Sequence, residues 1–336
     1  MRVLVTGANG FVGTATVRHL LQGGVCEVRR ALRSATPAAH DPSATPDTVA
    51  VGDIDGATDW CAALAGVDVV VHTAARVHMM RETEADPLVT FRRINTEGSV
   101  NLARQAAEAG VRRLVFISSV KVNGEATPPG QPFRPQDPVL CPDDPYGISK
   151  FEAEQGLREV AAATGLEVVV IRPVLVYGPG VRANFESMMK WVARGVPLPL
   201  GAIRANRRSL VGLDNLVDLI ACCATHPAAA GQVFFAADGE DVSTTELLTR
   251  VGAELGKPAR LLPVPPVLLQ AGARLAGCGA VVQRLCGSLQ VDISANTRLL
   301  GWQPPLSLGA GLSRAAGAFL AAQETRNGNG DAGSRV

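Results

Sequence analysis

The chain has 336 residues, and its 32 Lys and Arg against 31 Asp and Glu give a formal net charge of +1. Hydrophobic residues make up 47% of the chain, enough for a full core, so wholesale disorder is excluded. The balanced charge and the 4% aromatic content argue against a nucleic-acid binder, which needs a basic face or a base-stacking platform. The length is typical of about two domains or one large α/β unit.

Targeting and membrane-spanning signals are not visible in the sequence. The N-terminus lacks the apolar segment behind a basic start that a signal peptide requires. The seven cysteines include no C-x-x-C pair, which argues against a disulfide framework and a zinc site. The most apolar later stretch, residues 264–289, is interrupted by Arg274 and Arg284, so we expect a buried or surface-docked helix and no membrane insertion. These features predict a cytoplasmic protein.

Strand and helix signals alternate through the first half of the chain. Apolar runs predict strands at residues 2–6, 27–32, 49–51, 67–71, 111–117, 166–171 and 232–236. Apolar residues at helical spacing predict helices at 11–21, 96–109 and 145–163. Thr96 is the expected N-cap of the second helix, and Gly110 lies just past its end. Continuous apolar strands between helices indicate a parallel sheet covered on both faces, and hence a doubly wound α/β (Rossmann) fold.

The predicted elements divide the chain into a larger and a smaller part. We assign residues 1–175 to a dinucleotide-binding domain and expect 212–237 to return to it. Residues 176–211 and 238–320 form a smaller mixed α/β substrate lobe in this prediction. The polar, glycine-rich tail at 323–336 is expected to be disordered.

Two further segments have the composition of loops. Residues 34–48 are rich in Ala, Pro, Ser and Thr, which is typical of a surface loop. Residues 124–144 contain six prolines and can form neither a helix nor a central strand.

The first predicted strand runs directly into a glycine loop that opens the first helix. The loop reads Gly7-Ala8-Asn9-Gly10-Phe11-Val12-Gly13, a G-x-x-G-x-x-G spacing. Glycine permits the sharp turn and lets backbone N–H groups approach a pyrophosphate at the helix N-terminus. Its position between strand and helix predicts a dinucleotide-binding site.

The end of the second strand bears on which nicotinamide cofactor binds. An acidic residue there would accept hydrogen bonds from the ribose 2′-OH of NAD, whereas an arginine would favour the 2′-phosphate of NADP. The segment contains no acid, and Arg33 lies where the 2′ group is expected. NADP is therefore favoured, and NAD remains the alternative. Asp53 follows the next strand and either accepts from the adenine amino group or caps the following turn.

Tyr146 and Lys150 are spaced i, i+4 near the start of a predicted helix, so both side chains share one face. An ammonium ~4 Å from a phenolate stabilises it by ~4 kcal/mol at an effective dielectric constant of ~20, which lowers the tyrosine pKa from ~10. A bound, positively charged nicotinamide would act in the same direction. Ser119 follows the strand at 111–117 and can bond the substrate oxygen that gains or loses a proton. Together these residues predict a proton-shuttling site.

The chain resembles the extended short-chain dehydrogenase/reductase family over residues 1–320. The resemblance is carried by TGANGFVG (6–13), HTAA (72–75), ISSVKVNG (117–124), YGISK (146–150) and IRPVLVYGPG (171–180), together with Asp53 and Asn95. The nucleotide-sugar epimerase and dehydratase branch is most similar. Within it the match is best to bacterial enzymes acting at C4 of UDP-linked N-acetylhexosamines, including 4-keto reductases that form UDP-N-acetylquinovosamine for surface polysaccharide.

The resemblance implies a role for each matched residue. Ser119 and Tyr146 would be catalytic, and Lys150 would bond the nicotinamide ribose and lower the tyrosine pKa. Asn95 would support the active-site helix through water. The residues implied to bind the cofactor are Gly7, Asn9, Gly10, Phe11, Val12, Gly13, Arg33, Asp53, Ile54, Ala74, Ala75, Asn95, Tyr146, Lys150 and Pro173.

Some positions depart from the family pattern. Sugar 4,6-dehydratases carry an Asp-Glu pair where this chain has Val120 and Lys121, so dehydration is disfavoured. The expected substrate contacts are Ser119, Lys121, Asn184 and Arg208, the last through a guanidinium fork on the substrate phosphates. His72 and His78 are interpreted as packing or cofactor-lining residues, and no metal site is expected.

The leading prediction is an NAD(P)-dependent oxidoreductase acting at C4 of a nucleotide-diphosphate sugar. A UDP-4-keto-6-deoxy-N-acetylhexosamine 4-reductase in O-antigen biosynthesis is favoured, with a UDP-glucose or UDP-N-acetylglucosamine 4-epimerase as the alternative. Reduction of a hydrophobic ketone is a third possibility. A non-catalytic NAD(P)-sensing regulator is the alternative from another class, and such proteins commonly lose the tyrosine that this chain keeps. The resemblance also implies a homodimer.

Overall fold

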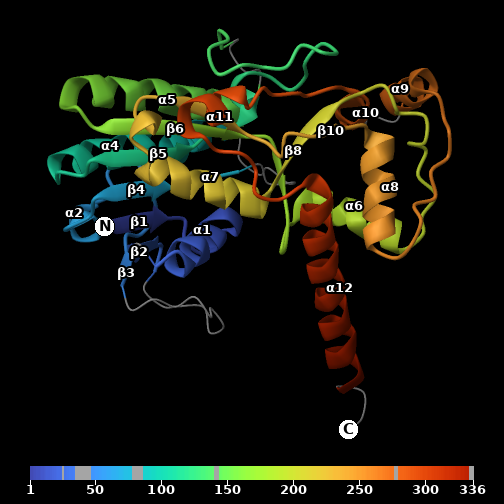
Figure 1. The fold of residues 1–336 in the computed structure, drawn as a ribbon, viewed down its shortest axis with the longest axis horizontal. Coiled ribbons are helices and arrows are strands. Elements are labelled where there is room, and N and C mark those ends of the chain that lie inside the picture. The colour runs from blue at the N-terminus through green and yellow to red at the C-terminus, as the bar shows by residue number, and fades with distance from the viewer. Residues whose placement is uncertain (25, 35–46, 78–85, 140–143, 276–278, 333–336) are drawn as a thin grey trace.

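Seven parallel strands form the central sheet of the molecule (Figure 1). The structure, a computed structural model, describes residues 1–24, 26–34, 47–77, 86–139, 144–275 and 279–332. The strands lie in the order β3-β2-β1-β4-β5-β6-β9. They are β1 Arg2–Thr6, β2 Glu27–Leu32, β3 Thr48–Ala50, β4 Val69–His72, β5 Arg113–Ile117, β6 Glu167–Pro173 and β9 Val233–Ala236. This arrangement confirms the predicted doubly wound α/β fold.

The strand order reverses between β1 and β4, which is where such a sheet opens a ligand crevice. β1 pairs with β2 on one side, with Thr6 opposite Ala31, and with β4 on the other, with Thr6 opposite His72. The carboxyl ends of these strands therefore meet at one edge of the sheet. The loop that follows β1 and the segment that follows β4 both begin at this edge.

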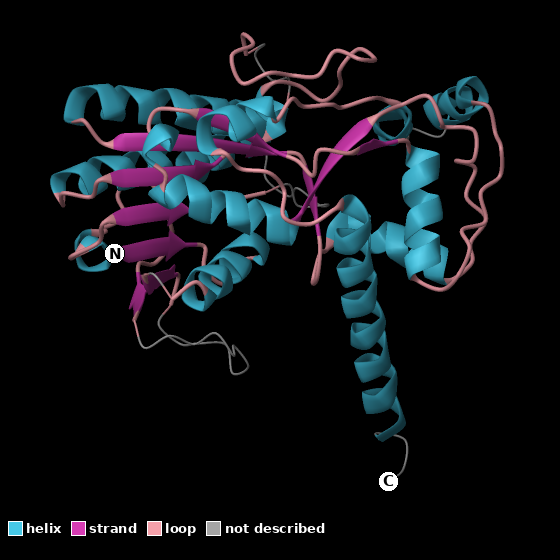
Figure 2. Cartoon of the chain, in the orientation of Figure 1, coloured by secondary structure: helices cyan, strands magenta, loops and turns pink. Residues whose placement is uncertain are grey.

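Helices cover both faces of the sheet, as Figure 2 shows. Val3 and Val5 of β1 face one apolar cluster, which includes side chains of α1 (Phe11–Gln22) and α7 (Leu213–Thr225). Leu4, between them, faces a second cluster with side chains of α2 (Cys61–Leu64), α4 (Gly98–Glu108) and α5 (Pro145–Thr164). Strand alternation thus explains how one continuous apolar run serves two cores.

A second, three-stranded sheet has the order β10-β8-β7 and belongs to the smaller lobe. Its strands are β7 Leu175–Tyr177, β8 Arg208–Gly212 and β10 Asp241–Val242, with β8 parallel to β7 and antiparallel to β10. A third apolar cluster joins it to α6 (Ala183–Ala193), α8 (Thr244–Glu254) and α12 (Leu308–Ala332).

The 212–237 segment lies with the large sheet, because β9 pairs with β6 and α7 packs against α1. On this arrangement we propose that residues 1–175 and 212–237 form the dinucleotide-binding domain and that residues 176–211 and 238–320 form the substrate lobe. The remaining short elements are the 3-10 turns η2 Val120–Val122 and η3 Pro227–Ala229, and the helix α11 Ser294–Leu300.

The helix predicted at 96–109 begins earlier than the sequence indicated. It starts as α3 (Pro87–Phe91), passes through a π-helical turn η1 (Arg92–Glu97) and continues as α4. The N-cap is Asp86, whose side chain accepts from the backbone N–H of Leu88 and Val89. Thr96 as N-cap was therefore wrong. Its hydroxyl instead donates to the Ser149 carbonyl oxygen at 2.9 Å, a contact between distant parts of the chain.

Two C-terminal predictions also change. Residues 264–289 form two helices, α9 (Pro266–Leu275) and α10 (Gly279–Cys286), where one was expected. Over the described parts of the chain, no helix has the length and apolarity needed to cross a membrane. The tail expected to be disordered from 323 continues α12 as far as Ala332. Residues 333–336 and most of the 34–48 loop lie outside the described residues.

Candidate functional site

The glycine loop forms a close-packed turn between β1 and α1. Gly7 has φ +63°, and a Cβ there would lie 2.8 Å from the Ala74 Cα atom. A Cβ on Gly13 would lie 2.1 Å from the Gly7 carbonyl oxygen, so neither position accepts a side chain without rearrangement. Gly10 caps α1, and no side chain caps this end of the helix. The backbone amides there suit the pyrophosphate of a dinucleotide, so the residues present fit that group.

The other implied cofactor residues lie along the same edge of the sheet. Asn9, Phe11 and Val12 belong to the loop or to the first turn of α1. Ala74 and Ala75 follow β4, and Ala74 N donates to Thr6 Oγ1 at 3.3 Å. The last two implied residues are Pro173, which ends β6, and Ile54, which contacts α4 at Gly98.

Arg33 and Asp53 come from different strand ends and meet. The Arg33 Nε atom lies 2.7 Å from Asp53 Oδ1, and both side chains are about four-fifths exposed at 80% and 79%. The sequence analysis favoured NADP because the end of β2 lacks an acid. The structure supplies that acid from the segment after β3, and its carboxylate neutralises the arginine charge. The preference for NADP is therefore not supported.

Tyr146 lies in the first turn of α5. Asp144 caps this helix, and its Oδ1 accepts from the Tyr146 N–H at 3.1 Å and from the Gly147 N–H at 3.2 Å. The Phe91 ring packs edge-on against the tyrosine ring, with centroids 6.0 Å apart. Burial, with a smaller contribution from the Asp144 carboxylate, raises the pKa of Tyr146 well above its ordinary value.

Lys150 lies one helical turn further along α5, with 1% of its surface exposed. Its ammonium donates to the Ile117 carbonyl oxygen at 2.8 Å and lies 4.5 Å from the centre of the Phe116 ring. Burial lowers the pKa of Lys150 to about 7, partly offset by the Glu154 carboxylate. Burial, with repulsion from Lys150, also lowers the pKa of His72 to about 3, so this histidine is neutral.

These pKa directions correct one expectation. The ammonium of Lys150 was expected to lower the pKa of Tyr146. Instead, the lysine is held by the end of β5, and desolvation of the phenol dominates, so the tyrosine pKa rises. In this state Tyr146 holds its proton firmly at neutral pH.

Ser119 lies on a short turn that is attached to α5 on both sides. Its Oγ accepts from the Lys121 N–H at 3.2 Å and caps the turn η2. Lys121 Nζ lies 3.4 Å from Asp144 Oδ1, just before Tyr146, and 3.1 Å from Glu125 Oε1. Ile117, two residues before Ser119, accepts from Lys150. The serine turn is thus held at the N-terminal half of α5, where Tyr146 and Lys150 lie.

A buried ion pair between α5 and β6 was not predicted from the sequence. Arg172 of β6 donates from Nε to Glu154 Oε1 at 2.9 Å and from Nη1 to Asn123 Oδ1 at 3.0 Å. Ser118 Oγ donates to the same Glu154 oxygen at 2.6 Å. Glu154 is one turn beyond Lys150, and that i, i+4 spacing was the available signal. Its partner lies on a strand and could not be identified from spacing.

Asn95 lies in the π-helical turn η1 and is buried. Its Nδ2 donates to Ser149 Oγ and to the Arg76 carbonyl oxygen, both at 3.0 Å, and its Oδ1 accepts from the Arg76 N–H at 2.8 Å. It therefore supports α5 through a direct hydrogen bond to the residue before Lys150. A π-helical turn is a common way to re-aim a side chain at a functional site.

The two remaining substrate candidates lie in the smaller lobe. Asn184 is exposed in the first turn of α6, next to Ala183, whose φ of +57° is strained for a residue with a side chain. Arg208 begins β8, and its Nη1 donates to the carbonyl oxygens of Arg284 and Gly287 at 2.7 and 3.2 Å. Burial, with repulsion from Arg284, lowers the pKa of Arg208 from its ordinary value.

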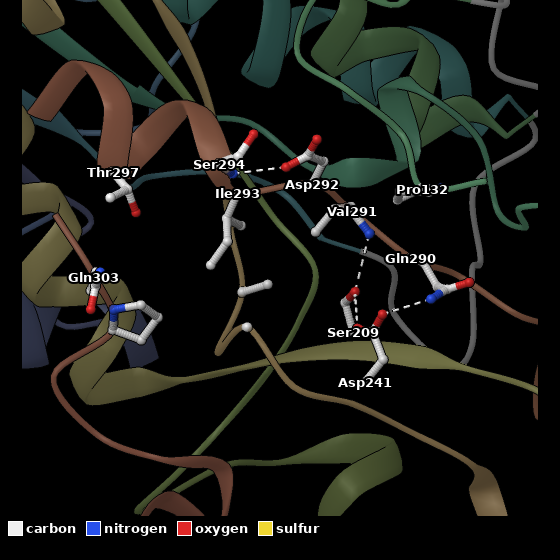
Figure 3. A pocket seen from close by; sticks show the side chains of 13 residues that line it. Pro132, Ser209, Asp241, Gln290, Val291, Asp292, Ile293, Ser294, Thr297 and Gln303 are labelled. Carbon is white, nitrogen blue, oxygen red and sulfur yellow. Dashed lines mark hydrogen bonds between the residues drawn. The ribbon is translucent and has the colours of Figure 1, made fainter. Parts of the chain in front are cut away.

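A cavity of about 540 Å³ lies elsewhere (Figure 3). Ser209 Oγ donates to Asp241 Oδ1 at 2.6 Å, Gln290 Nε2 donates to Asp241 Oδ2 at 2.7 Å, and Ser294 N donates to Asp292 Oδ1 at 2.8 Å. These polar groups of the cavity wall thus bond one another. The cavity is lined by none of the predicted site residues. In the described ranges, no cluster of three or more His, Cys, Asp or Glu side chains could hold a metal; His78 lies outside those ranges.

The chain is similar in sequence to known proteins of one family. Residues 3–237 match the model of the NAD dependent epimerase/dehydratase family. A UDP-glucose 4-epimerase of Vibrio cholerae is 48% identical over 320 residues, covering 95% of this chain and 96% of that protein. An N-acetyl-alpha-D-glucosaminyl-diphospho-ditrans,octacis-undecaprenol 4-epimerase of Escherichia coli O157:H7 is 28% identical, with 93% of each chain covered.

A solved structure extends the likeness to the three-dimensional level. A dTDP-glucose 4,6-dehydratase from Streptomyces venezuelae, crystallised with NAD, is 26% identical and has a TM-score of 0.74. The match covers 96% of this chain and 98% of that one. The glycine loop, Ser119, Tyr146 and Lys150 all lie within the residues that match the family model. The chain therefore belongs to the NAD dependent epimerase/dehydratase family.

Proposed function

We propose that this protein is an NAD-dependent 4-epimerase of a UDP-linked hexose, such as UDP-glucose or UDP-N-acetylglucosamine. The observation that carries the proposal is the attachment of the Ser119 turn to the start of α5, which holds Tyr146 and Lys150. This group lies at the carboxyl edge of the sheet that also carries the glycine loop. The 48% identity to a UDP-glucose 4-epimerase supports epimerisation over the reductase favoured by the sequence analysis.

The residues have distinct tasks in this proposal. NAD bound along the glycine loop would supply reversible hydride transfer at sugar C4. Tyr146 Oη takes the proton from the sugar 4-hydroxyl and later returns it, while Ser119 Oγ bonds the same oxygen. Lys150, buried beside the site, supplies positive charge when protonated and anchors α5 to β5. Tyr146 gives up its proton only when further positive charge is present, because burial raises its pKa in the structure described.

The choice of NAD rests on the pair of Arg33 with Asp53. A carboxylate at this position can accept from the ribose hydroxyls of NAD and repels the 2′-phosphate of NADP. The family description and the NAD bound to the dehydratase relative support the same choice.

The second candidate is reduction of a UDP-4-keto-6-deoxy-N-acetylhexosamine for O-antigen synthesis. It is supported by the overall sequence resemblance to bacterial enzymes that act at C4 of UDP-linked N-acetylhexosamines, which include such reductases. Val120 and Lys121 replace the acid pair of dehydratases, and Lys121 pairs with Asp144 and Glu125. Both candidates use the same proton donor and differ in whether the cofactor is consumed.

One set of assays tests the site and separates the candidates. The purified protein is given UDP-glucose or UDP-N-acetylglucosamine with NAD⁺, and separately the UDP-4-keto sugar with NADH. A new C4 epimer of the first two without net NADH formation supports the epimerase, and NADH loss with the keto sugar alone supports the reductase. Tyr146→Phe should retain dinucleotide binding and lose about 10²–10⁴-fold in turnover. Full turnover in that variant contradicts the assigned proton donor, and dinucleotide binding with no turnover on any substrate favours a regulator.

The assembly is part of the proposal as well. The family resemblance implies a homodimer formed by two helices from each subunit. Light scattering of the purified chain tests this directly, and a mass of one chain would contradict it.

A further inference from the structure

Two short helices at the end of the smaller lobe carry apolar side chains that face solvent. α9 and α10 pack against each other at the end of the molecule far from the seven-stranded sheet (Figure 1). Val267 and Leu268 of α9 are 75% and 63% exposed, and Val281 of α10 is 49% exposed. Leu262, just before α9, is 50% exposed. Exposed apolar residues gathered in this way indicate an interaction surface.

This surface is additional to the core of the lobe. Leu269 of α9 and Leu285 of α10 pack against the third apolar cluster, and Ala273 is buried. Leu269 and Ala273 share one helix face at i, i+4 spacing, whereas Val267 and Ala271 share another, and both of these are exposed. The inner face therefore attaches α9 to the lobe, and the outer face remains available to a partner.

The charge around the surface identifies the chemistry of that partner. Between Pro266 and Cys286, where α9 and α10 lie, the sequence has no Asp or Glu. Both arginines of this stretch, Arg274 and Arg284, are exposed. Exposed aliphatic side chains with basic residues and no acids match a surface of anionic lipid, where apolar groups enter the headgroup boundary and cations bind the headgroups.

We propose that Leu262, Val267, Leu268 and Val281, with their basic neighbours, dock the protein on an anionic membrane surface. The helices have 10 and 8 residues, too few to cross a bilayer. Arg208 donates to the Arg284 and Gly287 carbonyl oxygens, so the end of α10 is bonded to the strand that carries the proposed phosphate contact. Docking would hold the substrate lobe at the membrane. The inference rests on the surface alone and does not depend on the proposed function.

Vesicle sedimentation tests the proposal. The full chain is mixed with phosphatidylcholine vesicles that contain phosphatidylglycerol, and with vesicles of phosphatidylcholine alone. The wild type should sediment with the anionic vesicles, less so at high salt, and much less with the neutral ones. The double variant Val267→Asp/Leu268→Asp should lower the bound-to-free ratio at least about tenfold, because burial of each aliphatic side chain is lost. Leu21→Asp, at an exposed apolar position on α1, is the control and should bind as the wild type does.

Further readouts make the result decisive. Arg274→Gln should weaken binding to anionic vesicles and leave the dinucleotide affinity unchanged. If the aspartates prevent folding, Val267→Ser/Leu268→Ser replaces them. The proposal is overturned if the wild type sediments with neither kind of vesicle, or if the double variant binds as well as the wild type. It is also overturned if, without vesicles, the double variant changes the mass seen by light scattering, since the face then joins two copies of the chain.

Discussion

Individual side chains set the electrostatics of the candidate site. Glu154 and Arg172 form a buried ion pair between α5 and β6, and Lys150, also buried, donates to the Ile117 carbonyl oxygen. Buried charges are costly unless paired, so each depends on its neighbour. Ser118 and Asn123 bond the same pair and flank the turn that carries Ser119. The ion pair therefore bonds the segment on either side of Ser119 to α5, which carries Tyr146 and Lys150.

Glu154→Gln tests this dependence. The change leaves the Arg172 guanidinium buried without a full counter-charge, so the free energy of unfolding should fall by about 3–5 kcal/mol. Arg158→Gln is the matched control, because Arg158 pairs with the same carboxylate but is 49% exposed, and it should cost less than about 1 kcal/mol. Urea unfolding measures both. Equal small losses would show that the pair is not structurally important.

The proposed choice of NAD rests on one exposed pair, Arg33 with Asp53. Asp53→Asn releases the charge of Arg33 toward a 2′-phosphate, so the affinity for NADP relative to NAD should rise by up to about fivefold. Adding Arg33→Gln to this variant should remove the gain. Titration of both dinucleotides measures the ratio, and no change in the single variant would mean that Asp53 does not influence cofactor choice.

At the scale of elements, the tight contact between β1, α1 and the segment after β4 creates the dinucleotide cradle. Gly13 lies inside α1, where glycine is usually unfavourable. The lack of room for a side chain at this position outweighs the poor helix propensity of glycine. The sequence pattern alone indicated this position. The 2.1 Å separation from the Gly7 oxygen gives the physical reason.

Gly13→Ala should therefore displace α1 or the loop, lowering the free energy of unfolding by at least about 3 kcal/mol and weakening dinucleotide binding. Gly317→Ala in α12 is the contrasting change, since nothing lies within 4 Å of the added Cβ. It should raise stability by about 1 kcal/mol through helix propensity. Thermal unfolding and dinucleotide titration check both, and a stable Gly13→Ala variant with normal binding would contradict the close contact.

At the scale of the whole molecule, each lobe contains one of the two tyrosines of the chain, half-buried at Tyr146 and buried at Tyr177. Tyr146 lies at the candidate site, whereas Tyr177 donates to Asp238 Oδ2 at 2.7 Å in the smaller lobe. Burial raises the pKa of both, with Asp238 adding to the shift at Tyr177. The folded state thus holds two protons that the unfolded chain releases above about pH 10.

Stability should therefore be unaffected by these groups below about pH 10 and should fall as the pH rises beyond it. The lowered pKa of Lys150 acts in the opposite sense, raising stability between about pH 7 and 10.5, so its window overlaps the start of the tyrosine effect. Tyrosinate absorbance should appear together with loss of helical circular dichroism. In Tyr177→Phe the remaining signal belongs to Tyr146, and ionisation of that residue near pH 10 in the folded protein would contradict its burial.

The sequence by itself determined the parallel sheet, the glycine loop and the serine, tyrosine and lysine group. These depend on local spacing: apolar runs for buried strands, glycine where side chains cannot fit, and i, i+4 spacing along a helix. Only the tertiary structure decided that Arg33 meets Asp53, that Lys150 is held by the end of β5, and that Glu154 pairs with Arg172. Each of these joins residues from separate elements, and burial then sets their charge states. Distances across the fold and desolvation cannot be deduced from spacing along the chain.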